Sequence, residues 1–329
     1  MLWHNWQQVP ARIVSAAALA LGVMALANHF IARRTERRYP PSGQFITVEG
    51  VRLHYREQGK GPPVVLLHGN GAMVEDFTSS GLFDALAADH RVIVFDRPGF
   101  GHSQRPRGRI WTVAAQAKLL HQAMLRLGAE RPVLVGHSWG TLVALAMALE
   151  HQAEVRALVL LAGYYRPTRR LDVSLVSLLA LPVLGTLARY TILPLLGRLV
   201  LPRLLRQIFA PAPVAPGFRA GFPVAMALRP SQLRASAADT ALMIPGVAAL
   251  HHRYGELTLP VRILGGTEDC LVETRYQALH LHRQIGQSLL QQVEGAGHMI
   301  HHSAPALVLA AIRSIPVPLP DDRGAGTGG

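Results

Sequence analysis

A serine between two glycines is the first feature of this sequence with the composition of a reactive site. The segment Gly136-His137-Ser138-Trp139-Gly140 follows the apolar run PVLV and leads directly into TLVALAMALE, a helix-like run. Small residues two positions either side of a serine let a strand and a helix approach closely around a strained turn. The turn presents the hydroxyl at the strand end, where a helix N-terminus favours developing negative charge. We therefore predict that Ser138 is a nucleophile; the alternative is a glycine-bounded turn with an incidental serine.

A nucleophilic serine needs a base to take its proton and a carboxylate to orient that base. Among the sixteen histidines, His298 stands out because it follows the glycine-rich segment 295–297, directly after a predicted strand. Asp269 lies in a second such segment, GGTED, after another predicted strand, and Glu268 beside it is the alternative acid. We expect Ser138, Asp269 and His298 to form one site.

The run His298-Met299-Ile300-His301-His302 also has a spacing that occurs in metal sites. The sequence places no carboxylate cluster and no cysteine beside this run to complete a ligand set. We therefore expect neither a metal ion nor another cofactor.

The rest of the chain alternates between strand and helix patterns, which is typical of a mostly parallel sheet with helices on both faces. Gly50 separates the first two strands and predicts a hairpin. The predicted strands are 45–49, 51–57, 63–68, 91–96, 132–136, 155–161, 261–265 and 288–293, and the predicted helices are 82–89, 113–127, 141–151 and 274–285.

One long segment interrupts this alternation. Residues 164–259 are rich in leucine and proline and predict a helical insertion between two strands. The sequence thus divides into an N-terminal segment (1–38), a first core part (39–163), a helical cap (164–259), a second core part (260–315) and a disordered tail (316–329).

Residues 11–32 are largely apolar and about long enough to cross a bilayer as a helix. The basic run RRTERR follows them, and such clusters are retained on the cytoplasmic side. We predict an uncleaved, single-pass membrane anchor with the following domain in the cytoplasm. The alternative is a signal peptide cleaved near Ala27, followed by export.

The charge and the cysteine content limit the kinds of partner and site that we expect. The net charge is +13, almost all of it from arginine, and the arginines are interleaved with apolar runs. This pattern favours a solvated surface or contact with anionic lipid over nucleic acid, which we do not expect as a partner. The single cysteine, Cys270, excludes an intrachain disulfide and a cysteine-based zinc site.

The motifs in their order resemble the α/β-hydrolase superfamily, over about residues 44–314. Four blocks carry the resemblance: 68–71 (HGNG), 96–103 (DRPGFGHS), 136–140 (GHSWG), and the pair Asp269 and His298. The resemblance implies Ser138 as nucleophile, His298 as base and then acid, and Asp269 as its orienting partner. It also implies an oxyanion hole formed by the backbone N–H groups of Asn70 and Trp139.

The resemblance further implies a serine hydrolase that acts on a carboxylic ester through an acyl-enzyme. Related haloalkane dehalogenases and epoxide hydrolases carry Asp where this chain has Ser138, which disfavours both activities. The apolar cap and the predicted anchor favour a lipophilic small-molecule substrate. Hydrolysis of a carbon–carbon bond, acyl transfer and cofactor-free haloperoxidase chemistry are alternatives on the same fold. A non-catalytic binding or sensing module is the alternative of another class.

Overall fold

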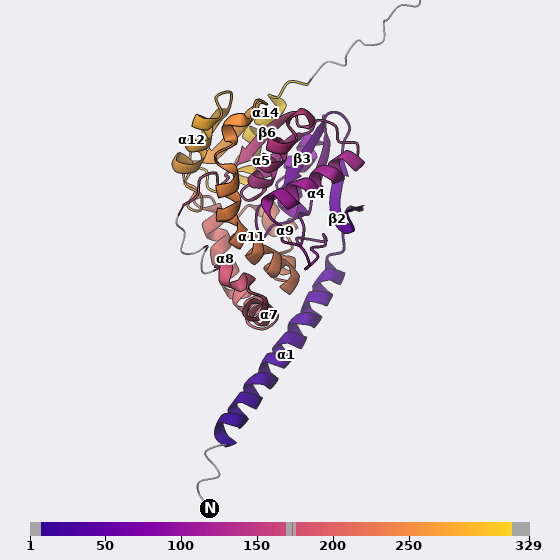
Figure 1. Cartoon of the computed structure of the whole chain (residues 1–329), viewed down its shortest axis with the longest axis vertical. Helices are drawn as coiled ribbons and strands as arrows, with labels where there is room; N and C mark the ends of the chain where they lie inside the picture. Colours follow the sequence, from indigo (N-terminus) through magenta and orange to yellow (C-terminus); the bar gives the residue numbers. More distant parts are fainter. Residues whose placement is uncertain (1–7, 169–172, 174–175, 318–329) are drawn as a thin grey trace, which may run out of the picture.

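The computed structural model describes residues 8–168, 173 and 176–317, and its body is an eight-stranded sheet covered by helices (Figure 1). The strand order is β1-β2-β4-β3-β5-β6-β7-β8. The strands are β1 (Gln44–Val48), β2 (Val51–Gln58), β3 (Pro63–Leu67), β4 (Arg91–Phe95), β5 (Val133–His137), β6 (Ala157–Leu161), β7 (Val261–Gly266) and β8 (Leu289–Val293).

The direction of the strands decides where the site residues meet. The hairpin β1–β2 and the pair β2–β4 are antiparallel, whereas all pairs from β4 to β8 are parallel. Gly136 on β5 lies opposite both Leu67 on β3 and Leu160 on β6. Because parallel strands end at the same edge, the segments after β3, β5, β7 and β8 come together there.

Two apolar layers hold the helices against the sheet. Helices α4 (Val113–Arg126), α5 (Gly140–Glu150) and α12 (Thr274–Gln284) contribute to the cluster on one face. Helices α2 (Val74–Thr78), α3 (Leu82–Leu86) and α14 (Pro305–Arg313) contribute to the cluster on the other. All eight predicted strands and the four predicted helices are present, with ends that differ by no more than three residues. The short helix α2 and helix α14 were not predicted.

Helices replace strands between β6 and β7, as the sequence predicts. They are α7 (Pro182–Tyr190), α8 (Leu193–Phe209), α9 (Pro216–Gly221), α10 (Val224–Ala227) and α11 (Pro230–Leu250). The short helix α13 (Ile300–Ser303) lies in the second core part, between β8 and α14. The limits 164–259 for a separate cap remain a prediction. Helices α7 and α8 meet at a bend of 74°. Large apolar side chains in and next to these two helices are exposed: Leu181, Val183, Leu184, Leu187, Ile192, Leu195, Leu196, Leu199, Val200 and Leu204.

Helix α1 (Gln8–Arg38) extends from the body past the end that carries α7 (Figure 1). The segment Ile13–Arg38 has a mean hydropathy of 1.8 in its most apolar window, and only 6% of that window is buried. The Nδ2 of Asn28 donates to the carbonyl oxygens of Tyr190 (2.9 Å) and Thr191 (2.7 Å). These bonds tie the helix to the end of α7, and most of the residues from Ile13 to Ala27 are exposed.

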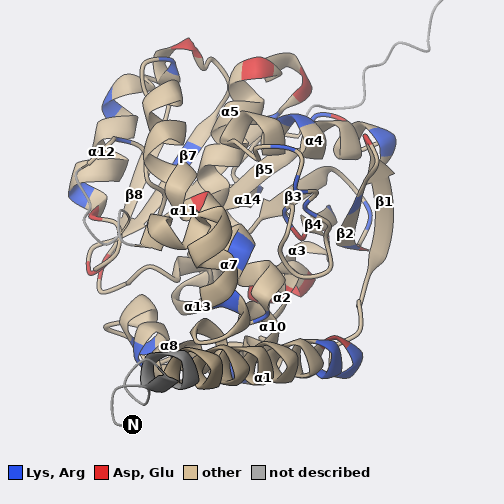
Figure 2. Ribbon diagram, turned by 60° about the horizontal axis from the view of Figure 1, so that its bottom comes forward, with Lys and Arg blue, Asp and Glu red and all other residues tan. Residues whose placement is uncertain are grey.

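Charge is concentrated at one end of this helix. Figure 2 shows basic residues gathered where α1 approaches β1, and they belong to the run RRTERR. Glu36 in this run pairs with Arg229 at the start of α11 (2.8 Å). The predicted disordered tail, 316–329, lies outside the described residues from position 318 onward, so that expectation remains a prediction.

Candidate active site

The backbone at Ser138 has the strained conformation that the glycine pattern predicts. Its φ is +50°, in the left-handed region that non-glycine residues rarely adopt. The Ser138 N–H donates to the carbonyl of Leu161 on β6 (2.8 Å), which fixes the turn to the sheet. A Cβ at Gly140 would lie 2.1 Å from the carbonyl oxygen of Leu67, so only glycine fits there. The serine is therefore held above the strand ends by close packing between α5 and β3.

His298 and Asp269 come from different loops and form a buried pair. The Nδ1 of His298 lies 2.8 Å from an Asp269 carboxylate oxygen. The other carboxylate oxygen accepts the backbone N–H groups of Leu271 (2.8 Å) and Val272 (2.9 Å), which fix the carboxylate. The neighbouring Glu268 is exposed, so the geometry favours Asp269 as the partner of His298.

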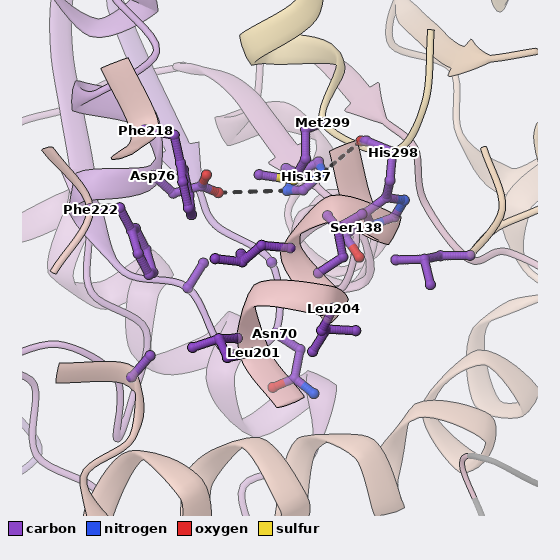
Figure 3. Close-up of a pocket in the computed structure, with 17 residues that line it drawn as sticks. Asn70, Asp76, His137, Ser138, Leu201, Leu204, Phe218, Phe222, His298 and Met299 are labelled. Atoms are coloured by element: carbon purple, nitrogen blue, oxygen red, sulfur yellow. Dashed lines mark hydrogen bonds and ion pairs between the residues drawn. The ribbon is translucent and has the colours of Figure 1, made fainter. Parts of the chain in front are cut away.

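Ser138 and His298 line the same cavity, of about 270 Å³ (Figure 3). The Ser138 hydroxyl makes no hydrogen bond with the described residues, and the cavity gives it access to a ligand. Most of the remaining wall is apolar: Ala72, Leu201, Leu204, Leu205, Ile208, Phe218, Phe222, Ala227, Leu271 and Met299. Ser138 and His298 thus line a cavity suited to an apolar molecule.

Two backbone N–H groups beside the serine are unused. Those of Asn70 and Trp139 donate to no protein acceptor in the described part of the chain. The Asn70 side chain is held by α11, where its Nδ2 donates to the Ser236 carbonyl (3.2 Å) and the Thr240 hydroxyl (2.9 Å). A Cβ at Gly69 would lie 3.2 Å from the Ser138 Cβ, so the loop after β3 runs close to the serine.

A buried arginine positions this loop, and the sequence did not single it out. The Arg97 guanidinium donates to the carbonyl oxygens of His68 (2.9 Å) and Gly69 (3.0 Å). It also pairs with Asp239 of α11 at 2.7 Å, and both side chains are fully buried. Asp239 in turn pairs with Arg105 (2.8 Å). The segment 96–103 is one of the four blocks that carry the resemblance, and through Arg97 it helps to place the loop that carries Asn70.

A second buried network links the loops that carry Ser138 and His298. The Nε2 of His137 lies 3.1 Å from the His298 carbonyl oxygen, and its Nδ1 lies 3.7 Å from an Asp76 carboxylate oxygen. The other Asp76 oxygen lies 3.0 Å and 3.1 Å from the Nε2 atoms of His301 and His302. Burial favours the neutral carboxyl, but the contacts with these two histidines hold the pKa of Asp76 well below its usual value.

This network corrects one premise of the sequence analysis. The sequence shows no carboxylate cluster beside the run 298–302, but the fold brings Asp76 against it. Ligand atoms of Asp76, His137 and His301 lie within 4.8 Å of one another, close enough together for one metal ion to contact all three. A second group of this kind, His121, His151 and Glu154, lies nearer the surface.

Comparisons with known proteins agree with this architecture. The family model described as alpha/beta hydrolase fold matches residues 62–197. An uncharacterized protein of Mycobacterium tuberculosis is 33% identical over 288 residues, which span 81% of this chain and 79% of that protein. The chain belongs to the α/β-hydrolase family.

Two further matches show how far the likeness extends. A 2-hydroxymuconate semialdehyde hydrolase of Pseudomonas putida is 35% identical over 125 residues, 38% of this α/β-hydrolase and 44% of that enzyme. The crystal structure of a bacterial membrane phospholipase A superposes with a TM-score of 0.64 at 20% identity. This alignment covers 95% of the present chain and all of the other.

The Arg97–Asp239 network predicts a large stability difference between two substitutions of Asp to Asn. Asp239→Asn leaves two buried guanidinium groups without their carboxylate and should lower the free energy of unfolding by about 3–5 kcal/mol. Asp89→Asn removes a pair with Arg313 in which both side chains are 43% exposed, and should change it by less than about 1 kcal/mol. Urea unfolding in detergent micelles measures both. Equal effects would contradict the importance of the buried network.

Buried neutral histidines predict that this α/β-hydrolase loses stability in acid. Burial, helped by the charge of Arg97, lowers the pKa of His68 to about 4. Burial also lowers the pKa values of His137 and His301. The unfolded chain therefore binds protons first, so stability is complete above pH 6.5 and falls as the pH drops toward 4.

The contribution of His68 to this loss is about 3 kcal/mol. His68→Gln should flatten the dependence of unfolding free energy on pH between 6.5 and 4, whereas the exposed His252→Gln should leave it unchanged. Denaturant unfolding at several pH values measures both. A profile for His68→Gln as steep as that of the wild type would show that its protonation is not linked to folding.

Proposed function

We propose that this protein is a serine hydrolase that cleaves a carboxylic ester through an acyl-enzyme. The observation that carries the proposal is the geometry around Ser138, a strained serine that shares one cavity with a histidine fixed by a buried carboxylate. Two unused backbone N–H groups beside the serine complete the requirements for acyl transfer.

In the proposed reaction, the Ser138 Oγ attacks the ester carbonyl carbon while His298 Nε2 takes the hydroxyl proton. Asp269 accepts a hydrogen bond from His298 Nδ1 and so keeps Nε2 free to act as the base. The carbonyl oxygen becomes an oxyanion, which the N–H groups of Asn70 and Trp139 stabilise. When the tetrahedral intermediate collapses, the C–O bond breaks and His298 gives its proton to the departing alcohol. Water, activated by His298, then attacks the acyl-enzyme and releases the acid.

The walls of the cavity support a lipophilic acyl group. Helix α8 lines the cavity with Leu201, Leu204, Leu205 and Ile208, and it exposes Leu199 and Val200 on its outer side. One helix therefore separates the cavity from an apolar outer surface. A substrate that partitions into a bilayer would reach the serine past this helix.

We also propose that the protein is anchored by α1, with the catalytic domain on the cytoplasmic side. The part of α1 before Asn28 begins at Gln8 and is long enough, at 1.5 Å per residue, to cross about 30 Å of hydrocarbon. The bonds of Asn28 to the end of α7 hold the exposed apolar cap beside the emerging helix. The likeness to the membrane phospholipase A fold covers so much of the chain that it includes most of α1.

Substitution of two of the three proposed catalytic residues tests the mechanism. Ser138→Ala should lower kcat for ester hydrolysis by at least about 10³-fold and abolish labelling by a fluorophosphonate, and Asp269→Asn should lower kcat by about 10³–10⁴-fold. Glu268→Gln, which changes the exposed carboxylate next to Asp269, should leave kcat unchanged. A panel of esters of increasing acyl length should show kcat/KM rising with length. Unlabelled wild-type protein would favour a binding module, and a preference for short acyl groups would remove the lipophilic substrate.

The single cysteine tests the orientation of the anchor. Cys270 is exposed and is the only cysteine of the chain. A membrane-impermeant maleimide should leave it unlabelled in intact cells and label it after lysis, with Cys270→Ser as the control for background. The intact mass should show an N-terminus that retains α1. Labelling in intact cells, or a mass corresponding to cleavage near Ala27, would contradict the proposed topology.

Hydrolysis of a carbon–carbon bond is the second candidate, favoured by the partial likeness to 2-hydroxymuconate semialdehyde hydrolase. The same serine, histidine and oxyanion donors serve both reactions on this fold. A β-diketone included beside the ester panel distinguishes them, because a carbon–carbon hydrolase should turn over the diketone faster than any ester.

A further inference from the structure

A second cavity, of about 480 Å³, lies between the segment 105–111 and the helices α7 and α11. It shares no lining residue with the cavity that contains Ser138. Five arginines line it, and no aspartate or glutamate is among its described lining residues. We call it the arginine cavity, and its arginines are Arg105, Arg107, Arg109, Arg189 and Arg234.

Only two of these five charges are balanced by an acid. Arg105 pairs with Asp239 and Arg109 pairs with Glu49, each at 2.8 Å. The other three have no acidic partner among the described residues. Excess positive charge is therefore concentrated around one cavity, where an anion would be attracted from several sides.

The contacts of two of these three arginines are to neutral groups only. Arg189 donates to the Leu179 carbonyl and to the Thr186 hydroxyl (2.9 Å). Arg234 donates to the Arg105 carbonyl (2.6 Å). Arg189 is buried, and its Nε has no hydrogen-bond partner. Guanidinium groups therefore keep N–H donors that nothing described in the protein satisfies.

The electrostatics agree with the geometry. Burial lowers the pKa of Arg234, and the neighbouring Arg105, Arg107 and Arg189 lower it further. Burial, together with Arg107, lowers the pKa of Arg189 in the same way. The positive charges of neighbouring arginines thus disfavour the protonated forms of Arg234 and Arg189. A bound anion would reduce this repulsion between the arginines.

We propose that the arginine cavity binds a phosphate group. Several guanidinium groups that converge on one space match the oxygens of a phosphate, with which arginine forms paired hydrogen bonds. The cavity is wide enough for a phosphate ester as well as for free phosphate.

Apolar side chains also occur at this cavity and on the helix beside it. Ile110 lines the cavity and is 75% exposed, and α7, which contributes Arg189 to the wall, exposes Val183 and Leu184 outside the lining. A phosphate carried on a lipid headgroup would place its acyl chains against these side chains, whereas free phosphate would use the arginines alone. The experiment therefore needs one arm for each source.

The first arm titrates full-length protein in a neutral detergent with inorganic phosphate by calorimetry. The second arm counts phosphatidylglycerol and phosphatidylcholine molecules retained by the same protein, using native mass spectrometry. The test variants are Arg107→Gln, which alters an exposed side chain, and the double variant Arg107→Gln/Arg234→Gln. The control is Arg203→Gln on α8, an exposed arginine that removes the same charge outside the arginine cavity.

We expect saturable binding with one phosphate group per protein in at least one arm. The double variant should weaken it by at least about tenfold, which corresponds to 1.4 kcal/mol, whereas Arg203→Gln should change it less than twofold. Binding of inorganic phosphate with this pattern identifies free phosphate as a sufficient ligand. Retention of phosphatidylglycerol alone, with the same pattern, identifies a lipid headgroup.

Two results would overturn the proposal. One is the absence of binding in both arms by wild-type protein. The other is an equal loss in Arg203→Gln and the double variant, since that would reflect diffuse surface charge. Fluorophosphonate labelling of Ser138 in every variant shows that the fold is intact, and Arg107→Gln alone keeps the test decisive should the double variant unfold.

Discussion

The hydrogen bonds and the ion pair of the buried Arg97 guanidinium are the interactions on which the arrangement of this α/β-hydrolase fold depends. A charge without access to water must be matched by acceptors on all sides, and here these come from three separate parts of the chain. The carbonyl oxygens of His68 and Gly69 belong to the loop after β3, Gln116 to α4, and Asp239 to α11. One side chain therefore fixes the loop that carries Asn70 relative to both the sheet and the helices above it. The Trp139 indole, which donates to the Asp239 carbonyl at 3.0 Å, brings the serine turn into the same assembly.

Buried hydrogen bonds also fix the position of His298. Asp269 fixes the His298 imidazole, and His137 contacts the His298 carbonyl, so the ring and the backbone of one residue have separate supports. His137 directly precedes Ser138. The two proposed reacting residues are therefore connected, because the side chain of His137, next to Ser138, contacts the backbone of His298. Asp76 extends this connection to α13, since it contacts both His301 and His302.

The outer helices combine apolar and basic surfaces in a way that suits a membrane boundary. The exposed apolar side chains of α7 and α8 lie at the end of the body past which α1 extends (Figure 1). Arg105 and Arg234 each line two cavities, whose walls also include other arginines. Under the proposed anchoring by α1, the exposed apolar side chains would meet the acyl chains of an anionic leaflet, and the basic side chains would meet its headgroups.

The sequence by itself determined the local features of this protein. The runs of β-branched residues and leucine identified the strands, and the glycines at 136 and 140 identified the turn at Ser138, because these depend on neighbours along the chain. The chain order of the motifs also identified the family. Only the tertiary structure decided which buried polar and charged groups, distant in the sequence, pair with one another. Arg97 meets Asp239, and His301 meets Asp76, across separations of 142 and 225 residues. No local pattern marks such pairs, since the need for a counter-charge arises only when folding removes both groups from water.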